Sequence, residues 1–147
     1  MKIISIGKLN QDFLPIATHY KKIIKYQIIS IEIPSIQKLP PKQIKQSEAK
    51  LINKYIEAKS YRIVLDVIGK SLSSHEFANL LSTNLSLGEN IHFIIGGAFG
   101  LDESILDNAS IRLSLSNMTL PHQMAKIILL EQIYRAQTIL ENHPYHK

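Results

Sequence analysis

Five short runs of aliphatic and β-branched residues occur at intervals along the chain, and segments long enough to form helices separate them. The runs are residues 2–7, 27–33, 61–67, 91–95 and 111–115. Runs this short and this apolar are typical of strands buried on both faces, and their alternation with helices favours parallel pairing. The sequence therefore predicts an α/β fold in which helices cover both faces of a mostly parallel sheet.

Helix signals fill the segments between these runs. Asp12 is the expected N-cap of a first helix, and residues 42–59 are expected to form a lysine-rich helix after a proline-containing linker. Ser73 and Glu76 have the spacing of a capping box, which predicts a further helix that ends near Gly88. The lysine-rich helix is the most cationic segment, and such a face is more often solvated than bound to RNA.

The last predicted helix is the longest and the most apolar. Pro121 is suited to open it, and aliphatic residues surround it almost completely up to about Leu140. A helix of this kind has to be buried on two sides. In so small a chain we expect the sheet to cover one side and a second subunit to cover the other, which predicts a homodimer.

Size and composition limit what else the chain can be. Its 147 residues suit one domain spanning residues 1–147, and the absence of cysteine excludes a disulfide framework and a thiolate zinc site. No apolar run approaches the roughly 20 residues of a membrane span, and the first residues do not form a signal peptide. We therefore expect a cytoplasmic protein that does not associate with a membrane. The net charge of +5 favours a polyanionic partner.

Three segments lie at the ends of predicted strands or directly after them, and they should therefore meet at the carboxyl edge of the sheet, where open α/β sheets bind ligands. They are Leu65 and Asp66, the glycine-rich residues 96–100, and residues 115–120. Glycines let the backbone turn tightly and approach a ligand closely. The dinucleotide and P-loop glycine spacings are both missing, so these loops do not predict a dinucleotide or a nucleoside triphosphate.

Polar residues gather at the start of the last helix and along it. His122 lies at its beginning, and Glu131 and Arg135 are four residues apart, so their side chains can form an ion pair. Tyr134 projects to a neighbouring face. Each of these features, taken alone, is also typical of ordinary helix structure.

The chain ends in an unusual concentration of functional groups. Residues 142–147 read Asn-His-Pro-Tyr-His-Lys, with two imidazoles, one aromatic ring and one cation. No third histidine or carboxylate stands at ligand spacing beside them, so we expect no metal site. Aromatic and basic groups together suit stacking on an unpaired base and contact with its phosphate.

Four segments, in this order, resemble the RlmH family of SPOUT methyltransferases. They are residues 95–100 (IGGAFG), 113–122 (LSLSNMTLPH), 130–136 (LEQIYRA) and 142–147 (NHPYHK). The resemblance spans essentially the whole chain, and the order of several motifs makes a chance match very improbable.

The resemblance implies a fold, a reaction and an assembly. Members of the family have a SPOUT-type α/β fold with a C-terminal trefoil knot, whose loops form the cofactor pocket. They are enzymes that use S-adenosylmethionine to methylate N3 of a pseudouridine in 23S rRNA, and they act on the assembled ribosome. They are homodimers in which each subunit contributes to the other's active site.

The resemblance also assigns roles to individual residues. The cofactor contacts carried over by position are Leu65, Gly97, Leu115, Ser116, Asn117, Met118, Thr119 and Leu120. In the catalytic set, His146 or His122 is the hypothetical acceptor of the N3 proton, and Arg135, Tyr145 and Lys147 position the nucleotide. Lys126 stands where the family usually has Arg; if this position grips phosphate, the bidentate fork of the guanidinium is lost.

Two other functions are compatible with the sequence. Another SPOUT enzyme, for example one that methylates a tRNA ribose, would share the knot and the cofactor, but it would not explain the Pro-Tyr-His-Lys ending. A non-catalytic ribosome-binding factor would use the lysine-rich helix but would not need the glycine loop.

Overall fold

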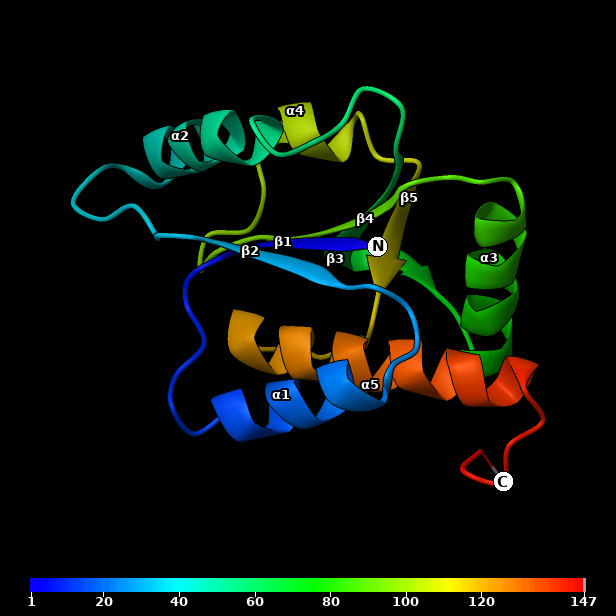
Figure 1. The fold of residues 1–147 in the computed structure, drawn as a ribbon. Coiled ribbons are helices and arrows are strands. Elements are labelled where there is room, and N and C mark those ends of the chain that lie inside the picture. Colours follow the sequence, from blue (N-terminus) through cyan, green and yellow to red (C-terminus); the bar gives the residue numbers. More distant parts are fainter. Residues whose placement is uncertain (147) are drawn as a thin grey trace.

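The computed structural model describes residues 1–146 and contains one five-stranded sheet in which every pairing is parallel. The spatial order is β2-β1-β4-β3-β5, and the sheet lies between two layers of helices (Figure 1). Because every pairing is parallel, the carboxyl ends of all five strands lie at the same edge of the sheet. The strands are β1 (Lys2–Ile6), β2 (Ile29–Ile33), β3 (Tyr61–Ser71), β4 (Ile91–Ile95) and β5 (Ile111–Ser114). This arrangement confirms the predicted parallel sheet.

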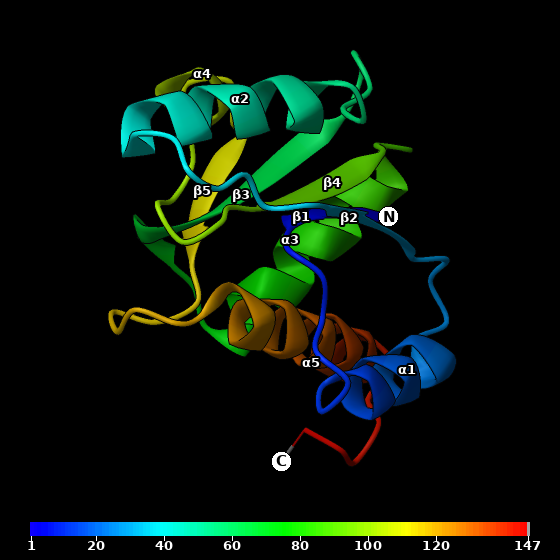
Figure 2. The same ribbon diagram turned by 90° about the vertical axis from the view of Figure 1, so that its left-hand side faces the viewer.

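Helices cover both faces of the sheet, as predicted. On one face lie α2 and α4; on the other lie α1, α3 and α5 (Figures 1 and 2). The helices are α1 (Leu14–Ile23), α2 (Pro41–Asn53), α3 (Ser74–Ser86), α4 (Glu103–Leu106) and α5 (His122–Leu140). None of the helices in residues 1–146 is both long and apolar enough to cross a bilayer.

Alternation along the strands produces two separate cores. Ile3 and Phe93 face the core beneath α1, α3 and α5, whereas Ile4 and Ile94 face the core beneath α2 and α4. All four side chains are completely buried. The period-two geometry of a strand thus explains why the apolar runs are continuous: both faces need apolar side chains.

The third strand is longer than predicted. β3 continues to Ser71, and its pairing with β5 is interrupted by a shift in register between Leu65 and Lys70. Gly69, expected to turn the chain, lies inside the strand. A Cβ on Gly69 would be 2.7 Å from the carbonyl carbon of Arg112, so a glycine is what allows the two backbones to approach.

Several predicted helix boundaries are confirmed and two are wrong. Ser73 and Glu76 form the reciprocal capping box, and Gly88 follows α3 with a φ of +74°. Asp12 does not cap α1, because its N-cap is Phe13 and no side chain accepts a cap hydrogen bond. The lysine-rich helix α2 ends at Asn53, six residues earlier than expected at residue 59.

The long helix α5 is buried within its own chain. It packs against α3 and α1 on its flanks and against β1 and β4 on the sheet. Leu129, Leu130 and Ile133 are completely buried. The burial of α5 therefore does not by itself require a second subunit. The apolar surface of this helix had led us to expect that a second subunit would cover one side of it.

Candidate active site

A cavity of about 710 Å³ lies at the carboxyl edge of the sheet. Its walls come from the middle of β3, the end of β4, the loops after β4 and β5, and the first turn of α5, with further residues from α2 and α4. Of the eight residues predicted to contact a cofactor, seven line this cavity: Leu65, Gly97, Leu115, Ser116, Met118, Thr119 and Leu120. Asn117 does not line it. The three segments predicted to meet at this edge therefore do meet.

The glycine loop, residues 96–100, forms one wall of the cavity. It packs so closely against its neighbours that side chains at Gly96 and Gly97 would not fit. A Cβ on Gly97 would lie 2.9 Å from the Ile6 side chain and 3.1 Å from a carboxylate oxygen of Glu48. A Cβ on Gly96 would lie 2.9 Å from Leu101. Real Cβ atoms do not approach other atoms so closely, so the close packing of this loop depends on glycine.

Local hydrogen bonds shape the opposite loop. The Ser114 hydroxyl donates to the carbonyl of Ser116 at 2.9 Å, and the Ser116 hydroxyl accepts from the amide of Met118 at 3.0 Å. These bonds hold residues 114–118 in a turn, with the Met118 side chain largely exposed. The turn leaves mainly backbone groups and apolar side chains to face the cavity.

Three ionisable residues outside the predicted cofactor contacts also line the cavity: Lys45, Asp66 and Glu103. One Asp66 oxygen accepts from the Ile68 amide at 3.3 Å, and the other is buried with no hydrogen-bond partner within residues 1–146. A buried carboxylate oxygen without a partner is costly, so it offers an acceptor for a ligand. The sequence predicted that Asp66 would lie at this edge with Leu65, and the structure places it at the shift in register within β3.

Among the members of the predicted catalytic set within residues 1–146, only His122 lines this cavity. Its ring rests against the backbone of Gly7, where a Cβ would be 2.6 Å from His122 Nε2. Gly7 has a φ of +86°, which favours glycine, so the chain after β1 provides a seat for the imidazole.

Arg135, Tyr145 and His146 form a second group at the far end of α5. The Arg135 guanidinium donates from Nε to Glu131 at 2.9 Å and lies 4.9 Å from the centre of the Tyr145 ring. Tyr145 packs edge-on against Tyr134, with ring centres 4.8 Å apart, and its hydroxyl donates to Glu131 at 3.2 Å. The predicted Glu131–Arg135 ion pair is therefore present, with Tyr134 beside it.

The Tyr145 hydroxyl is held in its protonated form. Burial raises the pKa of Tyr145 to about 12, and hydrogen bonding to Tyr20 and the charge of Glu131 act in the same direction. At neutral pH this phenol is therefore a hydrogen-bond donor with an aromatic face. Lys147, predicted to act beside it, lies outside the described residues.

The two groups do not meet within one chain. His122 and Arg135 are 13 residues apart on the same helix, which corresponds to about 20 Å at 1.5 Å per residue. Figure 1 shows the tail at the opposite end of α5 from the loop that precedes the helix. The structure of a single chain thus separates the predicted catalytic set into a cavity part and a tail part.

Lys126 is an internal residue and does not reach a phosphate. Its side chain is 2% exposed, and its ammonium donates to Glu32 at 2.6 Å and to the Ser5 hydroxyl at 3.2 Å. The possibility that this position grips phosphate is therefore wrong: the cation joins α5 to the first two strands.

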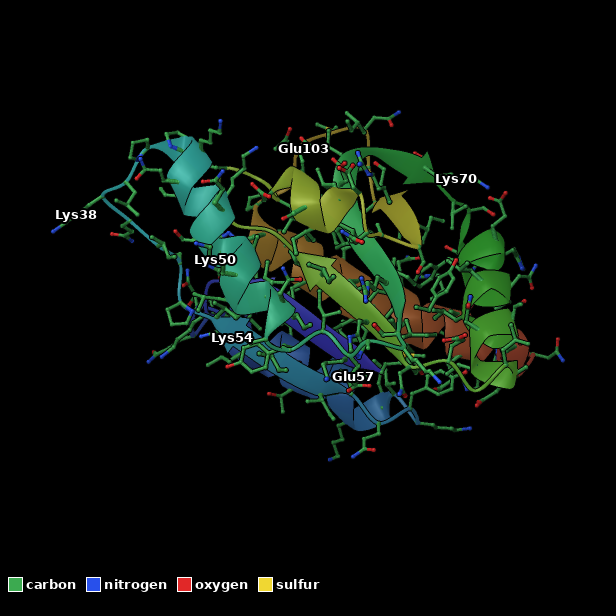
Figure 3. All side chains as sticks on the ribbon, turned by 90° about the horizontal axis from the view of Figure 1, so that it is seen from above. Lys38, Lys50, Lys54, Glu57, Lys70 and Glu103 are labelled. Carbon is green, nitrogen blue, oxygen red and sulfur yellow. The ribbon has the colours of Figure 1, made fainter. Side chains whose placement is uncertain are left out.

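The lysines in and around α2 form an exposed basic surface. Lys38, Lys50 and Lys54 lie along this helix and the loop before it (Figure 3). None of the three makes an ion pair within the described part of the chain, whereas Lys2 is paired with Glu57 at 2.7 Å. The surface thus carries cationic charge that is not neutralised locally.

Two solved structures have the same fold as this chain. A solved structure of a probable methylase family protein from Haemophilus influenzae Rd KW20 matches 99% of this chain and 70% of its own, with a TM-score of 0.57 and 15% identity. A putative methylase family protein from Neisseria gonorrhoeae matches 90% of this chain and 80% of its own, with the same TM-score and 13% identity. The chain therefore shares its fold with these two proteins.

Sequence comparison identifies the family. The model described as "Predicted SPOUT methyltransferase" matches residues 1–146, and this chain belongs to that family of methyltransferase enzymes. It is 42% identical to "Ribosomal RNA large subunit methyltransferase H" of Clostridium botulinum (strain 657 / Type Ba4) over 100% of this chain and 99% of the relative. The protein of the same name from Alkaliphilus oremlandii (strain OhILAs) is 41% identical over 99% of this chain. The resemblance drawn from the four motifs is confirmed.

Proposed function

We propose that this protein transfers a methyl group from S-adenosylmethionine to N3 of a pseudouridine in 23S rRNA, on the assembled ribosome in the cytoplasm. The observation that carries the proposal is the full-length identity of about 40% to relatives named for methylation of large-subunit ribosomal RNA. The cavity between the glycine loop and the loop after β5, together with the exposed lysines near α2, supports it.

The cavity residues fit this cofactor. A volume of about 710 Å³ is within the range of small-molecule sites, and its leucines suit the flat adenine ring. The cofactor also carries cationic groups, and Asp66 and Glu103 offer carboxylates in the same cavity. When bound, S-adenosylmethionine supplies a methyl group that its own positive sulfur has already activated.

The residues of the chain then have two tasks. Arg135 and Tyr145 are suited to hold the target nucleotide by charge and by stacking, so that its N3 lies in line with the methyl carbon. N3 must lose its proton as its electron pair forms the new N–C bond, while the electrons of the S–C bond remain on sulfur. His122 lines the cavity, and we propose it as the group nearest to that proton.

We further propose that the working site forms between two subunits of a homodimer, with the C-terminal knot expected from the family. Support comes from the distance of about 20 Å between the cavity and the tail group within one chain. A second copy that brings its tail to the first copy's cavity would complete both sites by two-fold symmetry.

A direct test measures methyl transfer and cofactor binding separately. Ribosomes from a strain that lacks the protein are incubated with the purified chain and labelled S-adenosylmethionine, and the rRNA is examined by mass spectrometry. We expect one added methyl group on a large-subunit pseudouridine. Label in tRNA ribose would instead favour another SPOUT activity, and the absence of calorimetric heat with S-adenosylmethionine would indicate a non-catalytic binding factor.

A further inference from the structure

His146 is held by two side chains that belong to different helices. Its Nδ1 lies 3.3 Å from the Arg135 Nη1 on α5, and its Nε2 lies 3.2 Å from the Nε2 of His75 in the first turn of α3. The two imidazole rings meet edge to face, with centres 4.8 Å apart. His75 is 71 residues away in sequence, and no motif pointed to it.

The chain turns back toward these helices through a defined cap. Asn142 has a φ of +53°, its amide donates to the Ile139 carbonyl at 3.1 Å, and the His143 amide donates to the Thr138 carbonyl at 2.8 Å. This pair of bonds is the Schellman arrangement that ends a helix and reverses the chain. As a result, residues 143–146 fold back along the end of α5 and toward the start of α3 (Figure 1).

The donors available in this group determine where the His146 proton lies. A guanidinium has only donors, so the Nδ1 of His146 must accept from Arg135. The ring proton is then on Nε2, which donates to the Nε2 of His75. His75 in turn carries its own proton on Nδ1. Glu131 orients the guanidinium from the other side at 2.9 Å, so the group forms a continuous chain of hydrogen bonds.

We propose that His75 is a positioning residue for the C-terminal tail: together with Arg135 it seats His146 as a neutral imidazole with its proton on Nε2. In this seat both ring nitrogens are occupied, so His146 has no lone pair to accept the N3 proton. The tail then serves to present Tyr145 and to orient the nucleotide, and His122 is left as the imidazole that can take the proton. The inference rests on the proposed function, because it concerns the nucleotide-binding part of that site.

Nitrogen-15 NMR of the full-length protein, with its histidine rings labelled, tests the seat without any RNA. We expect the His146 shifts of a neutral ring protonated on Nε2. In His75→Leu the acceptor is lost, and we expect the shifts to move toward a mixture of both tautomers. In His75→Gln the side-chain oxygen can still accept, and the wild-type pattern should return. A His146 ring protonated on Nδ1 in the wild type would overturn the proposal.

The rate of methyl transfer to ribosomes tests the functional consequence of this contact. His75 is exposed on α3, so neither variant should disturb the fold. Loss of one neutral hydrogen bond should slow transfer by His75→Leu about two- to tenfold, with unchanged calorimetric affinity for S-adenosylmethionine, and His75→Gln should be close to wild type. Equal rates for wild type and His75→Leu, or equal losses in both variants, would overturn the proposal. If the wild type methylates no rRNA, the proposed function fails, and the NMR spectra still decide whether His75 seats the tail.

Discussion

Lys126 shows how the environment of one residue decides its role. On a helix otherwise rich in aliphatic residues, a lysine suggests a contact with solvent or phosphate. Here its ammonium is buried, and its partners Glu32 and Ser5 belong to the first two strands. A buried cation is tolerated only when its partners compensate for lost hydration, so the pair fixes where the start of α5 lies on the sheet.

Replacement of Lys126 by methionine should therefore lower the free energy of unfolding. The Glu32 carboxylate, 28% exposed, would lose its partner, and we expect a loss of about 2–3 kcal/mol in urea denaturation. Lys25→Met is the matched control. Lys25 pairs with Glu141 at 2.7 Å on the surface, and the loss of this pair should cost less than about 1 kcal/mol. Equal effects of the two substitutions would show that the burial of Lys126 has no consequence for stability.

Gly97→Ala should weaken cofactor binding more than it weakens the fold. The new Cβ would meet Ile6 at 2.9 Å and Glu48 at 3.1 Å, so the loop must shift into the cavity. We expect the calorimetric affinity for S-adenosylmethionine to fall at least about tenfold, because cofactor sites depend on such preformed walls. Gly88→Ala serves as control: it strains a backbone with positive φ in open space away from the cavity, so stability should fall and affinity should not.

At the scale of secondary-structure elements, the start of α3 matters because it carries His75. The Ser73 amide donates to Glu76 at 2.7 Å, the Ser73 hydroxyl donates to the same carboxylate at 2.8 Å, and the Glu76 amide donates back to that hydroxyl at 3.2 Å. The capping box thus fixes the first turn of α3, and the first turn fixes the imidazole that contacts the tail.

The capping box should make the stability of the protein depend on acid pH. The hydrogen bonds from the Ser73 amide and hydroxyl lower the pKa of Glu76 below its usual value. A carboxylate with a lowered folded pKa stabilises the protein above its unfolded pKa of about 4.3, and this contribution is lost as the pH falls through the folded pKa. The free energy of unfolding, measured by denaturation at each pH from neutral to about pH 3, should therefore decrease less steeply for Glu76→Gln than for wild type. Parallel curves would mean that the cap contributes no pH dependence.

At the scale of the whole molecule, the parallel sheet and the long helix place the two parts of the proposed site at different positions in one chain. All strands deliver their carboxyl ends to the cavity, while α5 carries the tail about 20 Å away. If two copies combine, a defect in the cavity of one and a defect in the tail of the other should complement each other.

Mixed dimers provide the corresponding prediction. Neither Gly97→Val nor the double substitution Tyr145→Ala, His146→Ala should methylate ribosomes alone. Random pairing of equal amounts gives half mixed dimers, and each has one intact cavity facing one intact tail, so we expect about a quarter of wild-type activity. Co-expression followed by a rate assay measures this. No recovery above the separate variants would indicate that each site forms within one chain.

Much of this architecture could be predicted from sequence because it depends on local rules. Continuous apolar runs identified all five strands, with Ile91–Ile95 matching at both ends, and the Ser73–Glu76 spacing identified its cap. Errors arose where tertiary contacts decide the outcome. Gly69 continues β3 because the Arg112 backbone lies against it, and Lys126 is buried because Glu32 is near in space only.

The same distinction applies to the candidate site. Loops that follow parallel strands must lie at one edge, so the cavity wall could be assigned from Leu65, Gly97 and residues 115–120. The contributions of Lys45 and Glu103 depend on the direction of single side chains, which spacing does not reveal. His75 could not be predicted from the sequence, because only the folded chain brings α3 beside the last residues.

The left-handed turn at Asn142 sets a fixed reach for the end of the chain. Between that turn and the ring of Tyr145 there are only two residues, and the phenol must still arrive at Glu131. One inserted residue would displace the ring by about 3 Å along the chain, which exceeds the tolerance of a hydrogen bond. The segment between Asn142 and Tyr145 should therefore tolerate no inserted residue.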